Sequence, residues 1–283
     1  MKLPFNIQLK DKVCVVTGGT GVLCGAMADA LAECGAKVAI LALGQEDCEK
    51  KAREINENGG IAIGIEVNVL DKESLKKAHK IINEKFGQVD ILINGAGGNH
   101  PKGTTTKEYL DIEDIENEEL TTFFDLDPKG VEFVFNLNFL GTLLPSQEFS
   151  KDMINKEGAT IINISSMNSF TPLTKIPAYS GAKAAVSNFT QWLAVHMSKV
   201  GIRVNAIAPG FFVTDQNRRL LFNEDGTATA RTEKILNSTP MNRFGEADEL
   251  IGTLLYLVSK EASGFVNGVV IPVDGAFSAY SGV

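Results

Sequence analysis

The chain has 283 residues, of which 44% are hydrophobic and 22% charged, and its 27 basic and 35 acidic residues give a net charge of −8 at pH 7. This acidic balance excludes the broad basic surface with which proteins bind nucleic acids or anionic membranes. No apolar run reaches the length of a membrane span, and the N-terminus has no apolar core of the signal-peptide type. The four cysteines have neither a C-x-x-C pair nor metal-site spacing, so we expect packed thiols, no metal site and a cytoplasmic protein.

The first hundred residues alternate short apolar runs with amphipathic segments. The runs are largely apolar throughout, which is typical of strands buried on both faces of a parallel sheet. Strands are predicted over 13–17, 36–43, 61–67 and 89–94, and helices over 26–34, 46–58 and 71–86. This order predicts an α/β fold of the doubly wound type, with helices on both faces of the sheet.

The later part of the chain contains an insertion, a long helix and a lid. The segment 98–130 breaks the alternation and is predicted to be an insertion, and the polar segment 210–240 is predicted to be a substrate lid. A helical pattern covers 131–156, where Pro145 predicts a kink or break, and Trp192 is interpreted as a core residue. The other predicted strands are 160–164, 203–209 and 269–275, and the other helices are 179–199 and 245–259. Without a linker or repeat, residues 1–283 are predicted to form one domain.

A glycine-rich turn follows the first predicted strand. Gly18, Gly19 and Gly21 stand between that strand and the first helix. Glycines at this place let the backbone approach a pyrophosphate, and the start of the helix supplies N–H donors and a positive dipole end. Because the turn lies within an alternating strand and helix pattern, it predicts a dinucleotide site.

The end of the second predicted strand bears on which dinucleotide binds. An acidic residue there would accept the ribose hydroxyls, and an arginine would accept a 2′-phosphate. The chain has Ala42, Leu43 and Gly44 at this place, with Glu46 and Asp47 as the nearest charges. Acidic neighbours disfavour an additional phosphate, so NAD is expected over NADP, which is not excluded.

A serine, a tyrosine and a lysine lie close together in the segment 165–183. Ser166 precedes Tyr179 by thirteen residues, and Lys183 follows it by four, which places the tyrosine and the lysine on one face of a helix. We expect the ammonium to lower the pKa of the phenol from its usual value of about 10, so that the tyrosine can exchange protons near neutral pH. A second Tyr-x-x-x-Lys pair, Tyr256 and Lys260, is interpreted as a helix end with a cation in its last turn.

Three further motifs complete a pattern known from one enzyme family. They are Asn-Gly-Ala-Gly at 94–97, Asn138 within NFLGT, and Ala-Pro-Gly at 208–210. With these motifs, the glycine turn and the serine, tyrosine and lysine set, the chain resembles the short-chain dehydrogenase/reductases over essentially its whole length. The resemblance implies a seven-stranded Rossmann fold, a nicotinamide cofactor and a homodimer or homotetramer. It also implies catalysis by Ser166, Tyr179, Lys183 and Asn138, the last of these anchoring a water relay beneath the lysine.

The same resemblance assigns cofactor contacts. The turn at 94–97 would pack on the adenosine side, and the strand end at 208–214 would hold the nicotinamide carboxamide, with Thr214 as a polar contact. Asn68 stands where the family often has an aspartate that touches adenine. The implied contacts are Gly18, Gly19, Thr20, Gly21, Val22, Leu23, Asn68, Val69, Asn94, Gly95, Ala96, Tyr179, Lys183, Pro209, Gly210, Phe212 and Thr214.

Several longer segments resemble a narrower group, the short-chain type of D-mannonate oxidoreductase, also called fructuronate reductase. They include GGNHPKGTTT, APGFFVTDQNRRLL, TPMNRFG and the ending VDGAFSAYSGV. The likeness implies interconversion of D-fructuronate and D-mannonate by hydride transfer at C5, with Tyr179 as acid and base.

Polar residues near the expected carboxyl edge of the sheet are candidates for binding such a sugar acid, since a carboxylate needs a cation or several donors. These candidates are Asn99, His100, Asn168, Asn217 and Arg218. Two alternatives stay open: another sugar-acid or polyol dehydrogenase, acting at C5 of gluconate or 2-keto-3-deoxygluconate, and a non-catalytic regulator that senses a dinucleotide. An acyl-carrier reductase is disfavoured, because the acidic chain shows no basic docking face.

Overall fold

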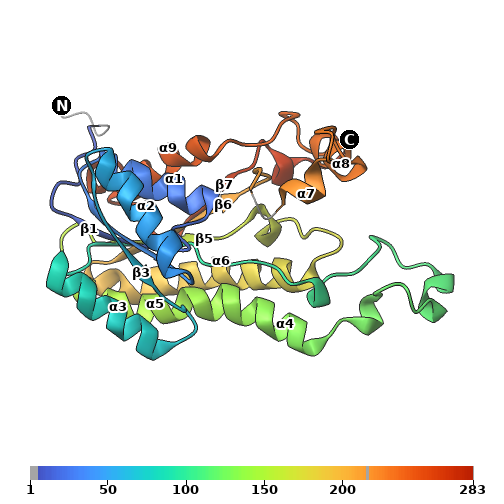
Figure 1. Ribbon diagram of the computed structural model, residues 1–283, viewed down its shortest axis with the longest axis horizontal. Coiled ribbons are helices and arrows are strands. Elements are labelled where there is room, and N and C mark those ends of the chain that lie inside the picture. The colour runs from blue at the N-terminus through green and yellow to red at the C-terminus, as the bar shows by residue number, and fades with distance from the viewer. Residues whose placement is uncertain (1–5, 215–216, 283) are drawn as a thin grey trace.

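The fold is built on a seven-stranded sheet in the order β3-β2-β1-β4-β5-β6-β7, with every pair of neighbours parallel (Figure 1). The computed structural model describes residues 6–214 and 217–282. The strands are β1 Val13–Thr17, β2 Lys37–Ala42, β3 Ile61–Glu66, β4 Ile91–Asn94, β5 Thr160–Ile164, β6 Arg203–Pro209 and β7 Val270–Val273. The predicted doubly wound parallel sheet is therefore confirmed.

Helices cover both faces of the sheet. Figure 1 shows α1, α2 and α9 on one face and α3, α4, α5 and α6 on the other. The α-helices of the described residues are α1 Val22–Glu33, α2 Gln45–Glu57, α3 Lys72–Lys85, α4 Pro128–Phe135, α5 Gly141–Phe149, α6 Pro177–Met197, α7 Arg218–Leu221, α8 Ala230–Asn237, α9 Ile251–Val258 and α10 Lys260–Ser263. Within the described residues, none of these helices is long and apolar enough to cross a bilayer.

Successive strand residues pack into two separate cores. Val16 of β1 belongs to a buried cluster with Leu31 of α1 and Leu254 of α9. Its neighbour Val15 belongs to a second cluster, on the other face, which includes Phe149 of α5. Since side chains alternate along a strand, both faces need apolar residues, and this explains why the strand segments are apolar throughout.

The carboxyl ends of three strands lie in register and define the edge where a ligand can bind. Thr17, the last residue of β1, pairs with Asn94 of β4, which pairs with Asn163 of β5. Strand β1 has β2 on one side and β4 on the other, so the strand order reverses at this point. A crevice outside the carboxyl ends at such a reversal is the usual binding place in doubly wound folds.

The long helix predicted over 131–156 is interrupted, but at a different place from the one expected. It begins at Pro128, after Asp127 accepts a hydrogen bond from the backbone N–H of Lys129 (2.9 Å). Pro145 lies inside α5, and the irregular part is the π-helical turn Asn136–Leu140 just before α5. The regular helical bonding is therefore interrupted one turn before the proline, while α5 continues through Pro145.

The helix predicted over 245–259 is also divided. A 3₁₀ turn covers Ala247–Leu250, and α9 ends at Val258. The hydroxyl of Ser259 then accepts a hydrogen bond from the backbone N–H of Ala262 (3.1 Å) and starts α10. Lys260 is therefore the first residue of a new helix, so its interpretation as a cation in the last turn of the preceding helix was wrong.

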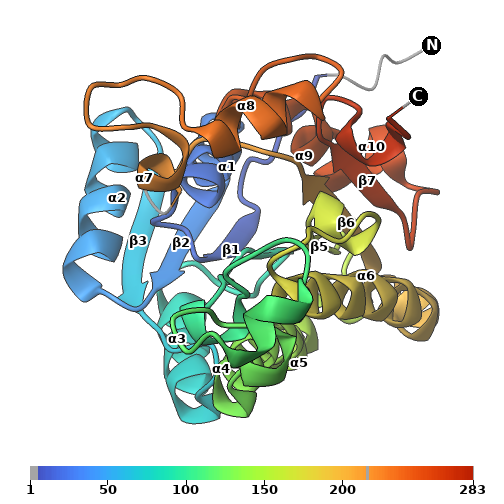
Figure 2. The same ribbon diagram turned by 90° about the vertical axis from the view of Figure 1, so that its right-hand side faces the viewer.

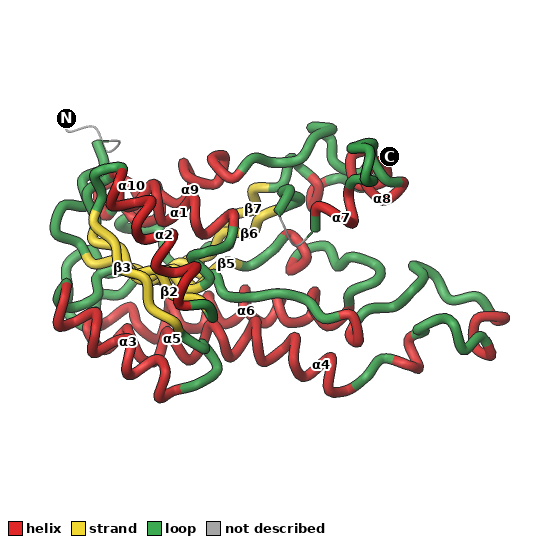
Figure 3. The backbone as a smooth tube through the Cα atoms, viewed as in Figure 1, coloured by secondary structure: helices red, strands yellow, loops and turns green. Residues whose placement is uncertain are grey.

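The insertion forms a projecting arm, which we define as residues 105–127. Its base is closed by backbone hydrogen bonds from Thr105 N to Lys175 O (2.9 Å) and from Thr106 N to Thr121 O (2.9 Å). Its ordered parts are the short 3₁₀ turns Ile112–Glu116 and Phe123–Asp125. Figure 3 shows the arm extending beyond the start of α4, away from the sheet.

Helices α7 and α8, which belong to the segment predicted to be a substrate lid, lie across the carboxyl edge from this arm. Figure 2, which looks onto that edge, shows α7 and α8 on one side and the arm with α4 on the other. A side-chain contact between Glu108 of the arm and Lys234 of α8 joins the two sides. The two regions that the sequence could not assign to the sheet therefore flank the expected ligand site.

Candidate active site

Ser166, Tyr179 and Lys183 converge beyond the carboxyl end of β5. Helix α6 starts at Pro177, two residues before the predicted start, because proline is preformed for the first helical position. The Nζ of Lys183 lies 5.6 Å from the centroid of the Tyr179 ring, and the Ser166 side chain is close enough to the phenol to oppose the rise of its pKa. Two hydroxyls are thus side by side, which is the arrangement needed to hold one carbonyl oxygen.

The two adjacent serines have different partners. The hydroxyl of Ser165 lies 3.2 Å from the Lys183 carbonyl oxygen, to which it donates, and 2.7 Å from the hydroxyl of Ser187. Ser165 therefore fastens α6 to the end of β5. Ser166 instead starts a 3₁₀ turn, with its oxygen accepting from the backbone N–H of Asn168 (3.3 Å), and its side chain is next to the tyrosine.

Burial raises the pKa of Tyr179 to about 12, and the hydrogen bond with Ser166 opposes that rise. Burial also lowers the pKa of Lys183 to about 8, with a smaller opposing effect from Cys24. The expectation that the lysine depresses the tyrosine pKa is therefore wrong, because burial is the larger effect. The physical reason is that both side chains are removed from water, which disfavours phenolate and ammonium alike.

Asn138 lies in the π-helical turn and is completely buried. Its amide nitrogen donates to the carbonyl oxygens of Gly98 (2.7 Å) and Val134 (2.8 Å), and the backbone carbonyl oxygen of Asn138 accepts a hydrogen bond from the hydroxyl of Thr142 (2.8 Å). Side chains thus satisfy carbonyls that the wide turn releases from regular helical bonding, and π turns of this kind are frequent at functional sites.

Gly97 separates Asn138 from Lys183. A Cβ at this position would lie 2.7 Å from Oδ1 of Asn138 and 3.2 Å from Nζ of Lys183. Any other residue would therefore press on both polar groups. Glycine keeps the space between them free of side-chain atoms, so one small proton carrier can contact the amide and the ammonium together.

A buried chain of polar side chains is linked to Asn138 through Thr142, whose carbonyl oxygen accepts a hydrogen bond from the hydroxyl of Ser146 (2.7 Å). The amide nitrogen of Asn94 donates to Ser146 (2.9 Å) and to Oδ1 of Asn163 (2.9 Å), whose own amide donates to Thr190 (2.9 Å). This chain connects β4 and β5 to α5 and α6, the helices on either side of the site. This chain was not predicted from the sequence, although polar residues inside apolar strands, such as Asn163 in TIINI, were a visible signal.

The turn after β1 fits the pyrophosphate of a dinucleotide. Gly18 has a φ of +67°, and a Cβ on it would lie 2.9 Å from the carbonyl oxygen of Gly95. The hydroxyl oxygen of Thr17 accepts from the backbone N–H groups of Gly95 (3.1 Å) and Ala96 (3.2 Å), so this turn and the 94–97 turn are held together. Gly21 precedes α1 and gives no side-chain cap, which leaves the positive end of the helix available to an anion.

The adenosine side of the crevice has an acidic and apolar character. Leu43, just after β2, is 69% exposed, and Glu46 and Asp47 occupy the first turn of α2. The cation Lys51 further along α2 pairs with Asp29 (2.7 Å). Asn68, in the adenine position implied by the resemblance, is exposed, and its Oδ1 accepts from the backbone N–H of Leu70 (3.0 Å).

The loop after β6 is held at the opposite end of the crevice. The backbone N–H of Gly210 donates to Val273 of β7 (2.9 Å), and Phe212 is buried. Oδ1 of Asn217 accepts from the N–H of Thr214 (2.8 Å), and its amide nitrogen donates to the carbonyl oxygen of Phe212 (2.8 Å). Asn217, a candidate substrate residue, thus uses its side chain to shape the loop that carries Thr214.

Among the other candidate substrate residues, Asn168 has the clearest structural signal. It is buried, close to Ser166, and its Oδ1 has no hydrogen-bond partner within the described part of the chain. Buried amide oxygens are normally satisfied, so an unpaired one beside a site indicates a place for a ligand donor.

The remaining candidates are more exposed and partly engaged. The amide of Asn99 donates to Thr104 (3.1 Å), and Nδ1 of His100 accepts from the backbone N–H of Lys102 (3.2 Å). Arg218 begins α7 and is exposed. The neighbouring residues Asp215 and Gln216 lie outside the described residues.

Fold and site together define a class of protein. The sequence profile of the short chain dehydrogenase family matches residues 12–225, and the chain belongs to this family of nicotinamide-dependent oxidoreductases. It is 59% identical to an uncharacterized oxidoreductase of Haemophilus influenzae over all of this chain and 99% of that protein. It is 51% identical to the uncharacterized oxidoreductase UxuB of Bacillus subtilis over 99% of this chain and 100% of the other.

One solved structure is similar throughout. It is a Haemophilus protein, provisionally assigned as a D-mannonate oxidoreductase and crystallised with bound NAD, with 60% identity and a TM-score of 0.94 over 98% of this chain and 99% of that chain. A more distant relative, 30% identical over 97% of this chain and 96% of its own length, is the 2-dehydro-3-deoxy-D-gluconate 5-dehydrogenase of Formosa agariphila.

Proposed function

We propose that the protein interconverts D-fructuronate and D-mannonate by hydride transfer at C5, with NAD as its cofactor. The reaction type is supported by the Ser166 and Tyr179 side chains, which interact with each other, and by Lys183, whose Nζ lies 5.6 Å from the centroid of the tyrosine ring. The main support for this substrate is the 60% identity, over nearly the whole chain, to the Haemophilus protein provisionally assigned as a D-mannonate oxidoreductase.

In the direction of reduction, the C5 ketone oxygen accepts hydrogen bonds from Ser166 and Tyr179, where negative charge develops. A bound nicotinamide supplies the hydride to C5, and takes it up in the reverse direction. Tyr179 transfers its phenolic proton to the oxygen, which becomes the C5 hydroxyl. Its raised pKa keeps it protonated at neutral pH, ready to act as an acid.

The proton on Tyr179 must then be replaced. Lys183 is the nearest cation to the phenolate that forms, and it stabilises that phenolate once the ligands are in place. Asn138 and the space at Gly97 provide the path along which a proton returns from solvent. In oxidation of D-mannonate every step reverses, and the phenolate acts as the base.

Polar side chains at the carboxyl edge would hold the sugar acid. Asn168 offers its unpaired amide oxygen to a substrate hydroxyl. Asn99, His100 and the lid residues Asn217 and Arg218 complete the proposed set, with Arg218 as its permanent cation for the carboxylate. These residues come from three separate segments, so a bound substrate would connect β4, β5 and the lid.

The cofactor preference follows from charge at the end of β2. Glu46 and Asp47 lie in the first turn of the following helix and disfavour the 2′-phosphate of NADP. NAD therefore binds better than NADP, and the similar Haemophilus structure contains NAD. The four cysteines are free thiols, and we propose that the protein works in the reducing cytoplasm, where thiols stay reduced.

The proposal is tested by measuring the oxidation of NADH and NADPH against a panel of keto acids. D-fructuronate with NADH is expected to give the highest kcat/KM. The panel includes 5-keto-D-gluconate and the C5 ketone derived from 2-keto-3-deoxygluconate, since relatives near 30% identity act on such compounds. A higher kcat/KM on either compound would replace the substrate, and failure on all with intact NADH binding would favour a sensor.

We also propose that the protein assembles as a homodimer or homotetramer through the outer face of α4 and α6. Phe133, Phe135, Trp192 and Val195 are all exposed on these helices. Trp192, expected in the core, is instead 54% exposed and stacks on His196 at 4.7 Å between ring centroids. Aromatic residues on an outer helix face are typical of an interface between subunits, and sedimentation velocity will show whether the purified protein is larger than a monomer.

A further inference from the structure

The arm at residues 105–127 accounts for the whole net negative charge of the protein. It holds nine of the 35 acidic residues and one of the 27 basic residues, so the rest of the chain has 26 of each and no net charge. Two of the carboxylates, Asp111 and Asp114, bind Lys107 at 3.1 and 2.6 Å. Most of the others lie on the exposed surface of the arm.

The same arm exposes large apolar side chains. Tyr109 is 77% exposed, Ile112 84%, Ile115 58%, and Phe123 and Phe124 are more than 60% exposed. Yet the arm is locally well ordered, with hydrogen bonds from the backbone N–H groups of Asp111 and Thr122 to the side chains of Asp114 and Asp125. A prefolded segment with an apolar tip is suited to binding a partner, because little conformational entropy is lost on association.

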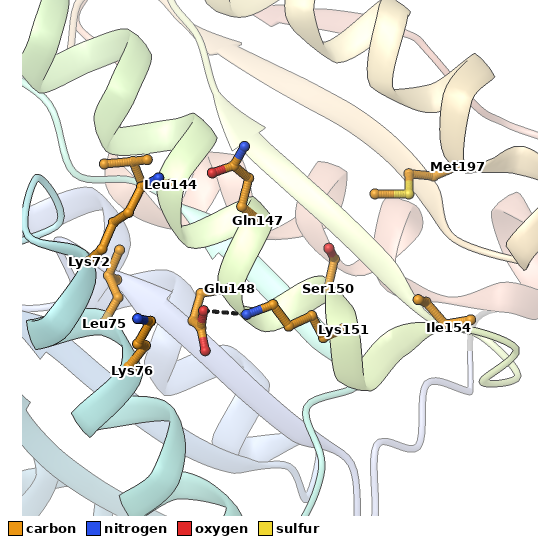
Figure 4. A pocket seen from close by; sticks show the side chains of 10 residues that line it. All are labelled: Lys72, Leu75, Lys76, Leu144, Gln147, Glu148, Ser150, Lys151, Ile154 and Met197. Carbon is orange, nitrogen blue, oxygen red and sulfur yellow. Dashed lines mark hydrogen bonds and ion pairs between the residues drawn. The ribbon is translucent and has the colours of Figure 1, made fainter.

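A groove with the complementary character lies at the far end of the molecule, between α3 and α5. Its volume is about 610 Å³. Leu75, Leu144, Ile154 and Met197 provide apolar lining, and Figure 4 shows lysine side chains among them. These lysines are Lys72 and Lys76 of α3 and Lys151, which follows α5 and binds Glu148.

The two features lie at opposite ends of one continuous helical run. The arm directly precedes α4 at Pro128, and the groove lies beside the end of the run, which closes with the 3₁₀ turn Ser150–Met153. These 26 residues span about 39 Å. Figure 1 shows the arm at one end of the molecule and α3 with α5 at the other, so the arm cannot reach the groove of its own chain.

A second copy of the chain brings them together. A two-fold interface on the face of α4 and α6 sets the equivalent helices of the two copies either parallel or antiparallel. In the parallel arrangement the two acidic arms would meet and repel each other. In the antiparallel arrangement the arm of one copy lies over the lysine-lined groove of the other, so charge selects the antiparallel pair.

We propose that the arm of each subunit docks in the groove between α3 and α5 of a second copy, with the apolar residues Ile112 and Ile115 against its apolar lining and Glu113 and Glu116 facing its lysines. This inference rests on the proposed pairing through α4 and α6, and adds a reciprocal contact outside that face. Because the arm also touches the lid through Glu108 and Lys234, the docked copy holds the arm that flanks the active site.

The test reverses charges on the arm and in the groove, separately and together, and measures the dimer dissociation constant of each variant by sedimentation velocity. Lys72→Glu with Lys76→Glu reverses charge in the groove, and Glu113→Lys with Glu116→Lys reverses it on the arm. Each pair alone is expected to weaken the dimer at least tenfold, and all four changes together should restore it to within about threefold. All four positions are exposed, so the fold should tolerate the changes. Lys77→Glu with Lys80→Glu, elsewhere on α3, is the matched control.

A covalent trap gives a second measurement. Ile112→Cys combined with Lys76→Cys is expected to form a disulfide between subunits on mild oxidation, and Ile112→Cys alone should not. Suppose that the wild-type protein forms a dimer, that neither charge-reversal pair changes the dissociation constant, and that the two-cysteine variant forms no cross-link. This result would overturn the arm proposal while leaving the pairing through α4 and α6 intact. A wild-type protein that is monomeric at all concentrations would overturn both.

Discussion

Lys183 and Tyr179 are one helical turn apart on α6, with the Nζ 5.6 Å from the ring centroid, and both are withdrawn from water. The ammonium donates to the carbonyl oxygen of Ile164 (2.8 Å), which fixes it beneath the ring. Burial raises the pKa of the tyrosine to about 12 and lowers that of the lysine to about 8, so at neutral pH the tyrosine keeps its proton and the lysine is still mainly an ammonium. The site therefore holds a proton on the tyrosine beside a buried ammonium, and this ammonium favours the phenolate that forms when the tyrosine gives up its proton.

The first prediction concerns the proton donor. Tyr179→Phe removes the phenolic oxygen but keeps the ring, so turnover of the ketone should fall at least a hundredfold while NADH binding is nearly unchanged. Steady-state kinetics and fluorescence titration of NADH measure the two effects. Tyr256→Phe is the matched control, since Tyr256 belongs to the other Tyr-x-x-x-Lys pair. A Tyr179→Phe enzyme with more than a tenth of the wild-type rate would remove Tyr179 from its proposed role.

The second prediction concerns the free energy of unfolding, which the burial of the Lys183 ammonium lowers. Its pKa falls from 10.5 to about 8, so between these two values the unfolded chain binds more protons than the folded one, and stability rises with pH in that window. Below pH 8 the full penalty of roughly 3 kcal/mol applies. Lys183→Met should therefore raise the melting temperature by several degrees at pH 7, with the advantage declining towards pH 10.

The control for this stability measurement is a substitution at an exposed lysine. Lys260→Met, at an exposed position, should leave the pH dependence as in the wild type. Differential scanning calorimetry across pH 6 to 10 compares the three proteins. An Lys183→Met variant that is less stable than the wild type at pH 7 would mean that the hydrogen bond to Ile164 outweighs the desolvation of the ammonium.

The strands and the buried helices could be predicted because the spacing of apolar residues along the sequence follows which side chains are buried. The segment 203–209 was placed with its observed bounds, since its apolar run ends at a proline that the structure also shows at the strand end. The site residues on these elements are consequently found where strand ends meet. The position of the irregular turn was not predictable, because Pro145 gave a strong local signal, whereas the π-helical turn at Asn136–Leu140 depends on tertiary bonds to Gly98 and the strands.

Ionisation was the other quantity that the sequence could not supply. Spacing alone places Lys183 next to Tyr179, and the favourable charge interaction was the natural inference. Desolvation depends on every element packed around the pair, which no local pattern contains. The same limit applies to Trp192, whose apolar ring fits either a core or an interface until the outer face of α6 is located.

The third prediction follows from the space at Gly97. Gly97→Ala places a methyl group 2.7 Å from Oδ1 of Asn138 and 3.2 Å from Nζ of Lys183, so it should displace the proton path and lower kcat by ten- to a hundredfold. The neighbouring Gly98→Ala is the matched control, because its methyl would meet only Leu137 at an ordinary 3.5 Å. Equal kcat values for the two variants would show that the space at Gly97 has no part in turnover.

The last prediction concerns the contact between the arm and the lid. Glu108 and Lys234 join residues 105–127 to α8 across the carboxyl edge, and this pairing raises the pKa of the lysine. Lys234 is largely exposed, so its loss should have a modest effect. If the segment 210–240 acts as the predicted lid, Lys234→Ala should raise KM for the substrate by about two- to fivefold without changing kcat, because the lid would close less often. The increase should disappear at high salt, where the wild-type pair is screened as well.

A reversed pair separates this contact from a general effect of charge. Glu108→Lys combined with Lys234→Glu should return KM to the wild-type value, while either change alone should raise it. Lys260→Ala, which breaks the contact with Glu157 on another part of the surface, should leave KM unchanged. If the reversed pair behaves like the single variants, the contact does not hold the lid, and the arm and α8 approach each other for another reason.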